Sequence, residues 1–388
     1  MPKILLSTAE VSAETHAADL LAALKALRPD LEADAGGGRL LAAAGARLVA
    51  DMSGKAVMGL KDAFASLSFY RESGKKLVAA VKRERYDAVV VVDAPSFHLP
   101  LAKIIHRDRP DLPIIYYIAP KLWVWKRWRA ESLRRDFAKT LCIFPFEERY
   151  FGGLGVNAVY VGNPTRDQLR NVDGKAVAAR FGVSWERRHE EPEKGLLAVF
   201  PGSRKGELSR LWPEMARALA GVRRRFPGLK PVVSLARNIA AADLAAIHPL
   251  PEGVDFSSGD SRELLAAASL VVAKSGTTTL EAALLGKPML VCYRVDAPSF
   301  ILAMFVIRIA RVALPNILAG DEVVREFLQD QATAANFLGE IERLLADRRY
   351  YRTMRSRLLS LADGLGEENS ALRAAREIAA FLPPRPPG

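Results

Sequence analysis

Residues 270–288 read LVVAKSGTTTLEAALLGKP, and this stretch decides the fold class of the chain. The first four residues form an unbroken apolar run, which is typical of a strand buried on both faces of a parallel sheet. A turn of small and hydroxyl residues follows, and a helix is expected from about Thr278 to Gly286. A strand, a short turn and a helix in this order form one unit of a doubly wound α/β fold.

The same alternation recurs along the 388 residues, which is long enough for more than one domain. We expect two Rossmann-like doubly wound domains that face a cleft, one over 1–165 and one over 166–365. A helix at about 366–382 is expected to pack back on the first domain, before a Pro-rich tail at 383–388. The first helix is expected at about Ala17–Leu27. Strands are expected at Lys3–Thr8, Ala88–Val92, Ile114–Ile118, Thr140–Phe144, Ala158–Val161, Leu196–Phe200, Pro231–Leu235, Leu270–Ala273 and Met289–Tyr293.

Charge and composition indicate which kinds of partner and location the protein has. Lys and Arg number 56 against 44 Asp and Glu, which predicts an anionic partner: nucleic acid, a lipid surface or a phosphorylated substrate. Two distant Cys make no disulfide framework, and no apolar stretch suits a signal peptide or a spanning helix, so a cytosolic location is expected. Without an Asp-x-Asp pair or a His cluster, neither a metal site nor a cofactor is predicted.

The turn after the strand at 270–273 predicts a phosphate site. A helix N-terminus offers free N–H groups and the positive end of the helix dipole. Glu281, in the first helical turn, would accept two ribose hydroxyls; alternatively, Thr278 simply caps the helix and Glu281 completes a capping box. The candidate donors are Lys274, Ser275, Gly276, Thr277, Thr278 and Thr279.

A second loop, FPGSRKGEL at 200–208, repeats this arrangement of strand, turn and helix. Ser203 and Arg204 are its candidate contacts, because a guanidinium fork can hold a pyrophosphate without a metal. A surface Arg in a turn is the alternative. Two such loops in one α/β half favour a nucleoside diphosphate ligand.

In the first half, Asp93 closes the strand in VVVVDAPSFH, where a carboxylate would face the ligand crevice and could act as a general base. The alternative is an Asp that caps the following turn. Glu10, Ser12 and Glu14 lie in the first expected βα loop and share that end of the sheet.

Two further segments suit a surface role. Lys121–Arg135 interleaves Trp with basic residues, which fits either stacking on single-stranded nucleic acid or a helix whose Trp side chains enter the core. Val57–Tyr70 fits either an amphipathic segment on an anionic bilayer or a core-facing helix. Its candidate membrane contacts are Val57, Met58, Leu60 and Phe64.

Several motifs together make the chain resemble the lipid-A-disaccharide synthases, bacterial glycosyltransferases with the two-domain GT-B architecture. The resemblance extends over nearly the whole chain. It rests on VMGL at 57–60, DAPSF at 93–97, YYIAPKLWVWKRWR at 116–129, FPFE at 144–147, VGNP at 161–164, PGSRKGE at 201–207, SGTTTLEAALLGKPMLVCYR at 275–294 and LPNILAG at 314–320.

The resemblance implies metal-free transfer of 2,3-diacylglucosamine from UDP to 2,3-diacylglucosamine 1-phosphate, with inversion to a β-1,6 link. It implies work at the anionic inner face of the cytoplasmic membrane, with no nucleic acid as partner, and leaves an oligomer open. By resemblance, UDP is held by Arg204, Ser275–Thr279, Glu281 and Asn316. Asp93, with Glu10 and Ser12, would serve the acceptor side.

The chain departs from the family pattern in places, and rivals stay open. The first loop has Ala9, Ala13 and Glu14 where the family usually has Gly, Gly and Asp, and Asn163 stands where His is common. Ser96 and His98 replace an Asp and an Asn. The rival functions are another UDP-sugar enzyme of this architecture, such as a polyprenyl-linked glycosyltransferase or a UDP-sugar 2-epimerase, and a basic nucleic-acid-binding protein.

Overall fold

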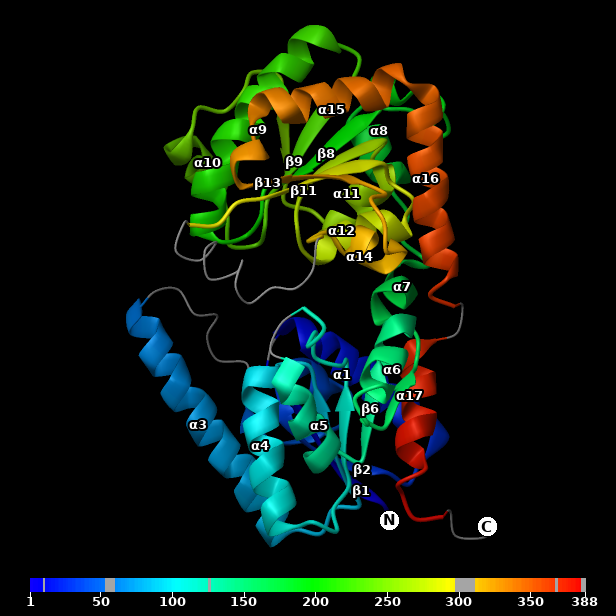
Figure 1. Ribbon diagram of the computed structural model, residues 1–388. Helices are drawn as coiled ribbons and strands as arrows, with labels where there is room; N and C mark the ends of the chain where they lie inside the picture. The colour runs from blue at the N-terminus through cyan, green and yellow to red at the C-terminus, as the bar shows by residue number, and fades with distance from the viewer. Residues whose placement is uncertain (10, 53–59, 125–126, 297–310, 367–368, 385–388) are drawn as a thin grey trace. The chain divides into compact units, whose positions relative to one another are not determined.

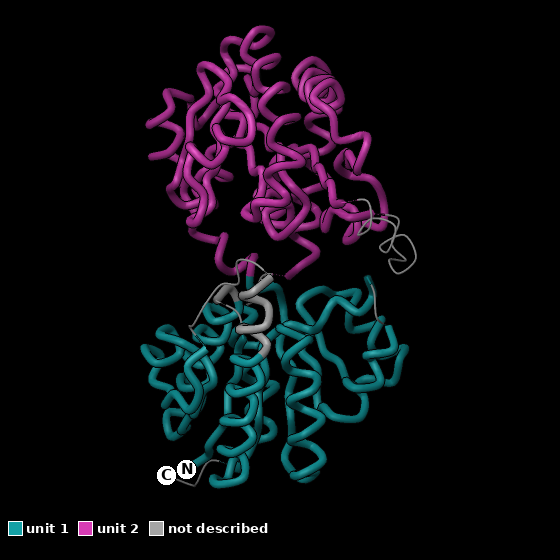
Figure 2. Tube along the Cα trace, turned by 90° about the vertical axis from the view of Figure 1, so that its left-hand side faces the viewer, with its two compact units in different colours: residues 1–164, 367–388 teal, residues 165–366 magenta. Residues whose placement is uncertain are grey.

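The computed structural model describes residues 1–9, 11–52, 60–124, 127–296, 311–366 and 369–384. For residues 11, 12 and 60–67 it describes the backbone alone. The chain forms two compact units (Figure 2). Unit 1 comprises residues 1–164 and 367–388, and unit 2 comprises residues 165–366. Each unit contains one parallel sheet and is an α/β domain, which confirms the predicted fold class.

Unit 1 is built on a seven-stranded parallel sheet of order β3-β2-β1-β4-β5-β6-β7 (Figure 1). Its strands are β1 (Lys3–Thr8), β2 (Glu32–Gly37), β3 (Arg47–Asp51), β4 (Ala88–Val92), β5 (Ile114–Tyr117), β6 (Lys139–Cys142) and β7 (Ala158–Tyr160). Its helices are α1 (Val11–Leu27), α2 (Arg39–Ala43), α3 (Leu60–Arg83), α4 (Pro95–Asp108), the 3-10 turn η1 (Arg127–Arg129), α5 (Ala130–Asp136), α6 (Pro145–Gly152) and α17 (Ser370–Ala379).

The central strand β4 explains why the chain folds this way locally. All five of its residues are fully buried, and they alternate between two apolar clusters. Val89 and Val91 belong to the cluster with α3 and α4, whereas Val90 and Val92 belong to the cluster with α1 and α17. Because helices cover both faces of the sheet, the strand is a continuous apolar run. Helix α17 packs on α1, so the C-terminal segment completes unit 1.

Unit 2 contains a six-stranded parallel sheet of order β10-β9-β8-β11-β12-β13. Its strands are β8 (Leu196–Phe200), β9 (Lys230–Ser234), β10 (Asp255–Ser257), β11 (Leu270–Lys274), β12 (Met289–Tyr293) and β13 (Arg325–Leu328). Its helices are α7 (Pro164–Leu169, which begins at the boundary), α8 (Lys175–Arg180), η2 (Pro192–Lys194), α9 (Lys205–Arg225), α10 (Ala241–Ile247), α11 (Ser261–Ala267), α12 (Thr277–Leu284), α14 (Leu314–Ala319), η3 (Gln329–Gln331), α15 (Ala334–Ala346) and α16 (Arg348–Asp363).

The stretch at 270–288 forms the predicted strand, turn and helix, as β11 and α12. Gly286 follows the helix with φ +61°, and a Cβ there would lie 2.6 Å from Leu359 of α16. Glycine is therefore needed both for the left-handed turn and for the close packing of α12 and α16. None of the helices among the described residues is both long and apolar enough to cross a bilayer.

Candidate active site

Asp93 lies at the carboxyl end of β4 in a constrained turn. Asp93 and Ala94 both have positive φ, +52° and +47°, which is costly for residues with a Cβ. Three hydrogen bonds hold the Asp93 backbone: its N–H donates to Tyr117 O at 3.0 Å, and its carbonyl accepts from the Tyr116 hydroxyl and from His98 Nδ1, each at 2.7 Å. The turn is thus fixed through the backbone of Asp93 and not through its carboxylate.

His98, one turn into α4, is itself held from the far side. Its Nε2 lies 3.0 Å from Ser7 Oγ on β1, and its ring is completely buried. Burial lowers the pKa of His98 to about 4, so the ring is neutral near pH 7. Because a carbonyl can only accept, Nδ1 carries the proton toward Asp93, and Nε2 accepts from the Ser7 hydroxyl. The histidine at position 98, which differs from the family pattern, is therefore explained by its two hydrogen bonds to Ser7 and to the Asp93 carbonyl.

The Asp93 carboxyl is suited to taking up a proton. Its side chain is partly buried, and this burial raises its pKa above the ordinary value, although the Ala94 N–H and the charge of Lys121 act against the rise. A carboxylate with a raised pKa is a stronger base than an exposed one. This is the chemistry expected of a group that deprotonates a sugar hydroxyl.

The first βα connection differs from the predicted loop. Helix α1 begins at Val11, not near Ala17, so the connection is short. Glu10 lies outside the described residues, and Ser12 is the second residue of α1, with its side chain outside the description. Their catalytic assignment stays a prediction.

Glu14, which the sequence placed at the ligand end of the sheet, binds backbone N–H groups of the protein itself. Its Oε1 accepts the N–H groups of Gly38 and Leu40, both at 2.9 Å, at the start of α2. The carboxylate therefore caps a short helix, where a negative charge is favoured by the helix dipole. A Cβ on Gly38 would lie 2.9 Å from this carboxylate, which explains the glycine at that position. The expectation that Glu14 lies in the first βα loop is wrong, because Glu14 belongs to α1.

In unit 2 the two predicted phosphate loops lie side by side, because β8 and β11 are neighbouring strands that pair up to Phe200 and Ala273. The loop after β8 turns at Gly202, with φ +113°. Arg204 follows with its side chain 83% exposed, and Glu207, in the first turn of α9, accepts from Lys274 at the end of β11 at 3.0 Å. The Glu207–Lys274 ion pair ties the loops together and leaves the Arg204 guanidinium accessible.

Helix α12 begins at Thr277, directly after the turn at Ser275 and Gly276, and presents its first-turn N–H groups at this edge. Thr277 is exposed and Thr278 half-buried. The hydroxyl of Ser275 donates to Val312 O at 2.9 Å, and that of the fully buried Thr279 donates to Gly276 O at 2.7 Å. The UDP contacts predicted for this turn stay a prediction, but the hydroxyls of Ser275 and Thr279 are already engaged within the protein. Those of Thr277 and Thr278 and the backbone N–H groups remain suited to donating to a ligand.

Glu281 is buried, and Arg262, a residue that the sequence did not single out, holds it. Arg262 Nε donates to Glu281 Oε1 at 2.9 Å, and Arg262 Nη2 donates to Gln168 Oε1 at 2.7 Å. This fixes one oxygen of the Glu281 carboxylate and orients the other. Arg262 could not be found from the motif, because it lies on α11, 19 residues earlier in the chain.

Asn316 supports the nucleotide region from inside the protein. Its Nδ2 donates to Val324 O at 2.8 Å and to Glu326 Oε1 at 2.7 Å. Its Oδ1 accepts from the N–H groups of Val323 and Val324 at 2.7 and 2.9 Å. Both donors and both lone pairs are used, and the side chain is fully buried. The expected direct contact between the Asn316 side chain and UDP is therefore corrected to a supporting role.

Asn316→Ala is accordingly expected to lower the free energy of unfolding by about 2–4 kcal/mol, because several buried hydrogen bonds lose their partner. Denaturant unfolding followed by circular dichroism measures this loss. Unchanged stability, combined with lost UDP affinity, would instead restore a direct contact with the nucleotide.

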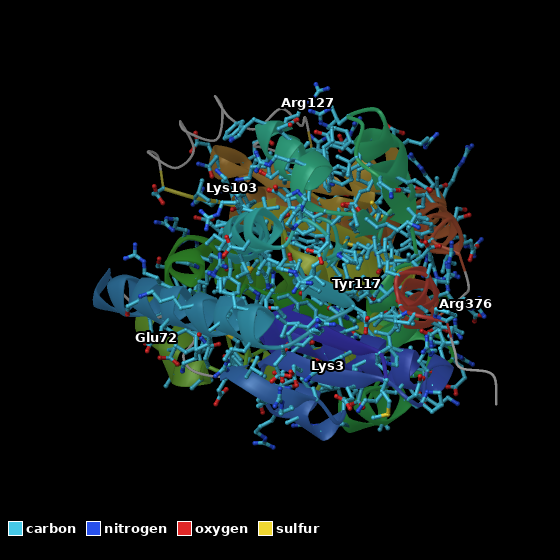
Figure 3. The ribbon with its side chains drawn as sticks, turned by 90° about the horizontal axis from the view of Figure 1, so that it is seen from below. Lys3, Glu72, Lys103, Tyr117, Arg127 and Arg376 are labelled. Atoms are coloured by element: carbon cyan, nitrogen blue, oxygen red, sulfur yellow. The ribbon has the colours of Figure 1, made fainter. Side chains whose placement is uncertain are left out.

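The aromatic and basic segment is not one continuous helix. It forms η1 and α5, with Trp128 69% exposed. Figure 3 places Arg127 at the periphery of unit 1 and Tyr117 in its interior. Before these elements, Trp123 Nε1 donates to Glu147 Oε1 at 3.0 Å. The predicted helix whose Trp side chains enter the core does not describe this segment, because Trp128 is exposed, and stacking on nucleic acid stays a prediction.

Glu147 is a second residue that sequence reasoning missed. It is fully buried at the start of α6, and its Oε2 accepts the N–H groups of Ile143 and Phe144, each at 3.1 Å. Burial raises the pKa of Glu147 to about 7 despite these donors. The Glu three residues after Phe144 in FPFE was the available signal, since this is the spacing of a capping box.

The predicted membrane segment cannot be placed in full. Val57 and Met58 lie outside the described residues, and Leu60 and Phe64 belong to α3 with their side chains outside the description. Further along α3, Phe69 and Tyr70 pack edge to face with ring centroids 5.6 Å apart. The membrane role of this segment stays a prediction.

The described residues thus provide a constrained carboxyl in unit 1 and, in unit 2, a sheet edge with donors suited to an anion. Within these residues, no three His, Cys, Asp or Glu side chains gather as metal ligands would.

Solved structures share the fold over nearly all of the chain. A crystal structure titled as the glycotransferase of kitacinnamycin is 16% identical with a TM-score of 0.63, covering 99% of this chain and 100% of that one. A co-structure of S. aureus MnaA with UDP is 15% identical with a TM-score of 0.64, covering 98% and 97%. At these identities the likeness establishes the fold alone.

Sequence relatives identify the family. A lipid-A-disaccharide synthase of Myxococcus xanthus (strain DK1622) is 35% identical over 99% of this chain and 98% of its own length. One of Anaeromyxobacter dehalogenans (strain 2CP-1 / ATCC BAA-258) is 35% identical over 97% and 96%. The family model for lipid-A-disaccharide synthetase matches residues 4–378. The chain belongs to the lipid-A-disaccharide synthetase family.

Proposed function

We propose that this protein transfers 2,3-diacylglucosamine from UDP-2,3-diacylglucosamine to 2,3-diacylglucosamine 1-phosphate, forming the β-1,6-linked lipid A disaccharide 1-phosphate and UDP. One agreement carries the proposal: the family match spans residues 4–378, and the same chain has two adjacent loops in unit 2 that suit a nucleoside diphosphate. The reaction makes the protein an inverting hexosyltransferase.

The acceptor side of the reaction uses Asp93. Its carboxylate takes the proton from the 6-hydroxyl of the acceptor as the oxygen of that hydroxyl attacks the anomeric carbon of the donor. The bond between that carbon and the UDP oxygen breaks, and the electron pair leaves with UDP. Attack from the face opposite the leaving group inverts the anomeric centre. The backbone restraints on Asp93 hold the base in one position, which lowers the entropic cost of reaching the transition state.

The leaving diphosphate is stabilised by unit 2. The exposed Arg204 supplies a guanidinium fork, and the N-terminus of α12, with Thr277 and Thr278, supplies donors for the developing charge. The oriented Glu281 carboxylate accepts from the ribose hydroxyls. Lys274 adds positive charge from the end of β11.

The test is the release of UDP, followed in a coupled assay with both substrates. The proposal predicts that UDP appears only when donor and acceptor are both present. A UDP-sugar 2-epimerase would change the donor without needing the acceptor, and a nucleic-acid-binding protein would release no UDP. Affinity for RNA or DNA that falls steeply with salt would favour the latter.

Turnover is expected to survive EDTA, because Arg204, Lys274 and the α12 N-terminus supply the positive charge that a metal ion supplies in other transferases. Initial rates with and without the chelator measure this. Loss of turnover in EDTA, with recovery on adding Mg²⁺ or Mn²⁺, would contradict the assignment of these groups.

The proposal also places the protein peripherally on the cytoplasmic face of the anionic inner membrane, through the segment beginning at Val57. Met58→Ser with Leu60→Ser is expected to weaken flotation with vesicles containing phosphatidylglycerol, because apolar insertion is lost. Binding should also weaken with salt, since basic residues contribute roughly 1 kcal/mol each near such a surface. Leu40→Ser, at an exposed position on α2, is the matched control. Equal flotation of the double variant and the control would exclude this segment.

A further inference from the structure

A group of basic residues lies at the amino edge of the sheet in unit 2, away from the nucleotide loops. Lys287, directly before β12, is 2% exposed, and its Nζ donates to Ala266 O at 2.6 Å and to Ala268 O at 3.0 Å. The nucleotide loops follow the carboxyl ends of β8 and β11. A strand of five residues spans about 16 Å, so the two edges are separate places.

Tyr351 of α16 connects this edge to the loop before β8. Its hydroxyl donates to Ser269 O at 2.9 Å, and His189 Nδ1 lies 2.9 Å from the same hydroxyl. A tyrosine has one hydroxyl proton, which Ser269 O receives, so His189 Nδ1 must donate to the tyrosine oxygen. This hydrogen bond orients the His189 ring, so that its Nε2 points away from Tyr351.

Two arginines complete the group. Arg188 stacks on Trp185 with its guanidinium carbon 3.5 Å from the ring centroid, and Arg355 stands one helical turn after Tyr351. The Nε atoms of Arg188 and Arg355 are both buried, and neither has a hydrogen-bond partner among the described residues. We call the following residues the basic cluster: Arg188, His189, Lys287, Tyr351 and Arg355.

Carboxylates balance the charges of the basic cluster only weakly, because Glu186 and Asp173 act on Arg188 from beyond ion-pair distance. In the part of the chain that the structure describes, no carboxylate lies within ion-pair distance of Arg188 or Arg355, whereas the neighbouring Arg348 pairs with Glu193 at 2.7 Å. The cations also act on one another: burial lowers the pKa of Lys287 well below its ordinary value, and the charges of Arg188 and Arg355 lower it further. Such a group is unfavourable unless something else compensates it.

A small anion would compensate it. A guanidinium presents its N–H groups in a fixed planar fork that matches the oxygen pairs of a phosphate, and the bond is charge-assisted. Lys287 lies beside Arg188 and Arg355, with its Nζ held by the two backbone carbonyls, so the guanidinium groups are the direct contacts of the anion. We propose that the basic cluster binds a phosphate-type oxyanion, at a site separate from the nucleotide loops.

This site does not depend on the proposed transfer reaction. The direct measurement is calorimetric binding of inorganic phosphate to the full chain in low-salt chloride buffer, with and without saturating UDP. Phosphate should bind in both conditions, because UDP occupies only the loops at the other edge. Separate titration with UDP alone reports on the nucleotide site, so failure of one assignment is distinguishable from failure of the other.

Arg355→Gln is the decisive variant, and Arg352→Gln, an exposed position on the same helix, is its matched control. In the presence of UDP, phosphate affinity should fall at least tenfold in Arg355→Gln and stay unchanged in Arg352→Gln. Without phosphate, the melting temperature of Arg355→Gln should equal or exceed that of the wild type, because repulsion is relieved. This second readout separates loss of a ligand contact from misfolding. Arg188→Gln should weaken phosphate binding in the same way.

The source of the anion is distinguished by flotation with vesicles of phosphatidylglycerol and of phosphatidylcholine. Lower affinity of Arg355→Gln for inorganic phosphate, with unchanged flotation, identifies a free phosphate-type anion. Reduced flotation of this variant on phosphatidylglycerol alone identifies a lipid headgroup phosphate. If Arg355→Gln and Arg352→Gln behave alike in both assays, or if the wild type binds neither probe when UDP is present, the proposal is overturned.

Discussion

Asp93→Asn is expected to lower kcat by about 10²–10⁴-fold, the range that a positioned general base usually contributes. The change keeps the size of the side chain and removes its basicity. The fold of the turn should survive, because Tyr116 and His98 donate to the backbone carbonyl of residue 93 and do not require its carboxylate. UDP affinity should be unchanged, since the nucleotide loops belong to unit 2.

Steady-state rates and calorimetric UDP titration together test this prediction, with Asp111→Asn, an exposed carboxyl in the same unit, as control. The pH profile adds a second test. Because burial raises the pKa of Asp93 and only the ionised form accepts a proton, kcat/KM should fall on the acid side, starting at a higher pH than for an exposed Asp. Asp93→Asn should lack this acid limb. A variant that keeps most of its activity would remove Asp93 from the mechanism.

Arg204→Ala is expected to weaken UDP binding by about 10- to 100-fold, the effect of losing a charge-assisted hydrogen bond, and to lower turnover as well. The exposed guanidinium pairs with Glu207 at 3.6 Å and with no other carboxylate of the described residues, so folding stability should hardly change. Arg204→Lys should give an intermediate affinity, because it keeps the charge and loses the planar fork.

The control for this variant is Arg217→Ala, which removes an exposed, paired arginine of α9, the helix that follows Arg204. Calorimetric titration with UDP compares the two. Arg204→Ala should change both UDP binding and turnover, whereas Asp93→Asn should change turnover alone, and this difference separates the two roles. Unaltered UDP affinity in Arg204→Ala would show that the loop after β8 does not grip the diphosphate.

The sequence predicted those parts of the fold that rest on local apolar pattern. The Val-rich β4 and the runs of β8, β11 and β12 were visible because each is buried on both faces. Strand β2 was missed, since its sequence, EADAGG, has no β-branched residue. Its glycines are explained by packing: a Cβ on Gly36 would lie 2.8 Å from Leu77, and one on Gly37 would lie 2.4 Å from Leu41. The contact of Gly36 with Leu77 of α3, far along the chain, leaves no local signal.

In the candidate site, too, local patterns were predictable and contacts between distant residues were not. The strand, turn and helix N-terminus of each predicted phosphate loop were predictable, because they are neighbours in the sequence, and phosphate binding itself stays a prediction. The partners that orient the site were not predictable. Arg262 reaches Glu281 from another helix, and Ser7 reaches His98 from a strand 91 residues earlier. Asn316 was expected to touch the nucleotide, but its buried hydrogen bonds became evident only from the packing of the 323–326 segment.

The most direct test of the proposed function is mass analysis of the product. The full chain is incubated with UDP-2,3-diacylglucosamine and 2,3-diacylglucosamine 1-phosphate, and lipid products and UDP are quantified together. The account predicts a tetra-acylated disaccharide 1-phosphate and UDP in equal amounts, with both absent when either substrate is omitted. An isomerised UDP-sugar, or consumption of the donor without a disaccharide, would contradict it.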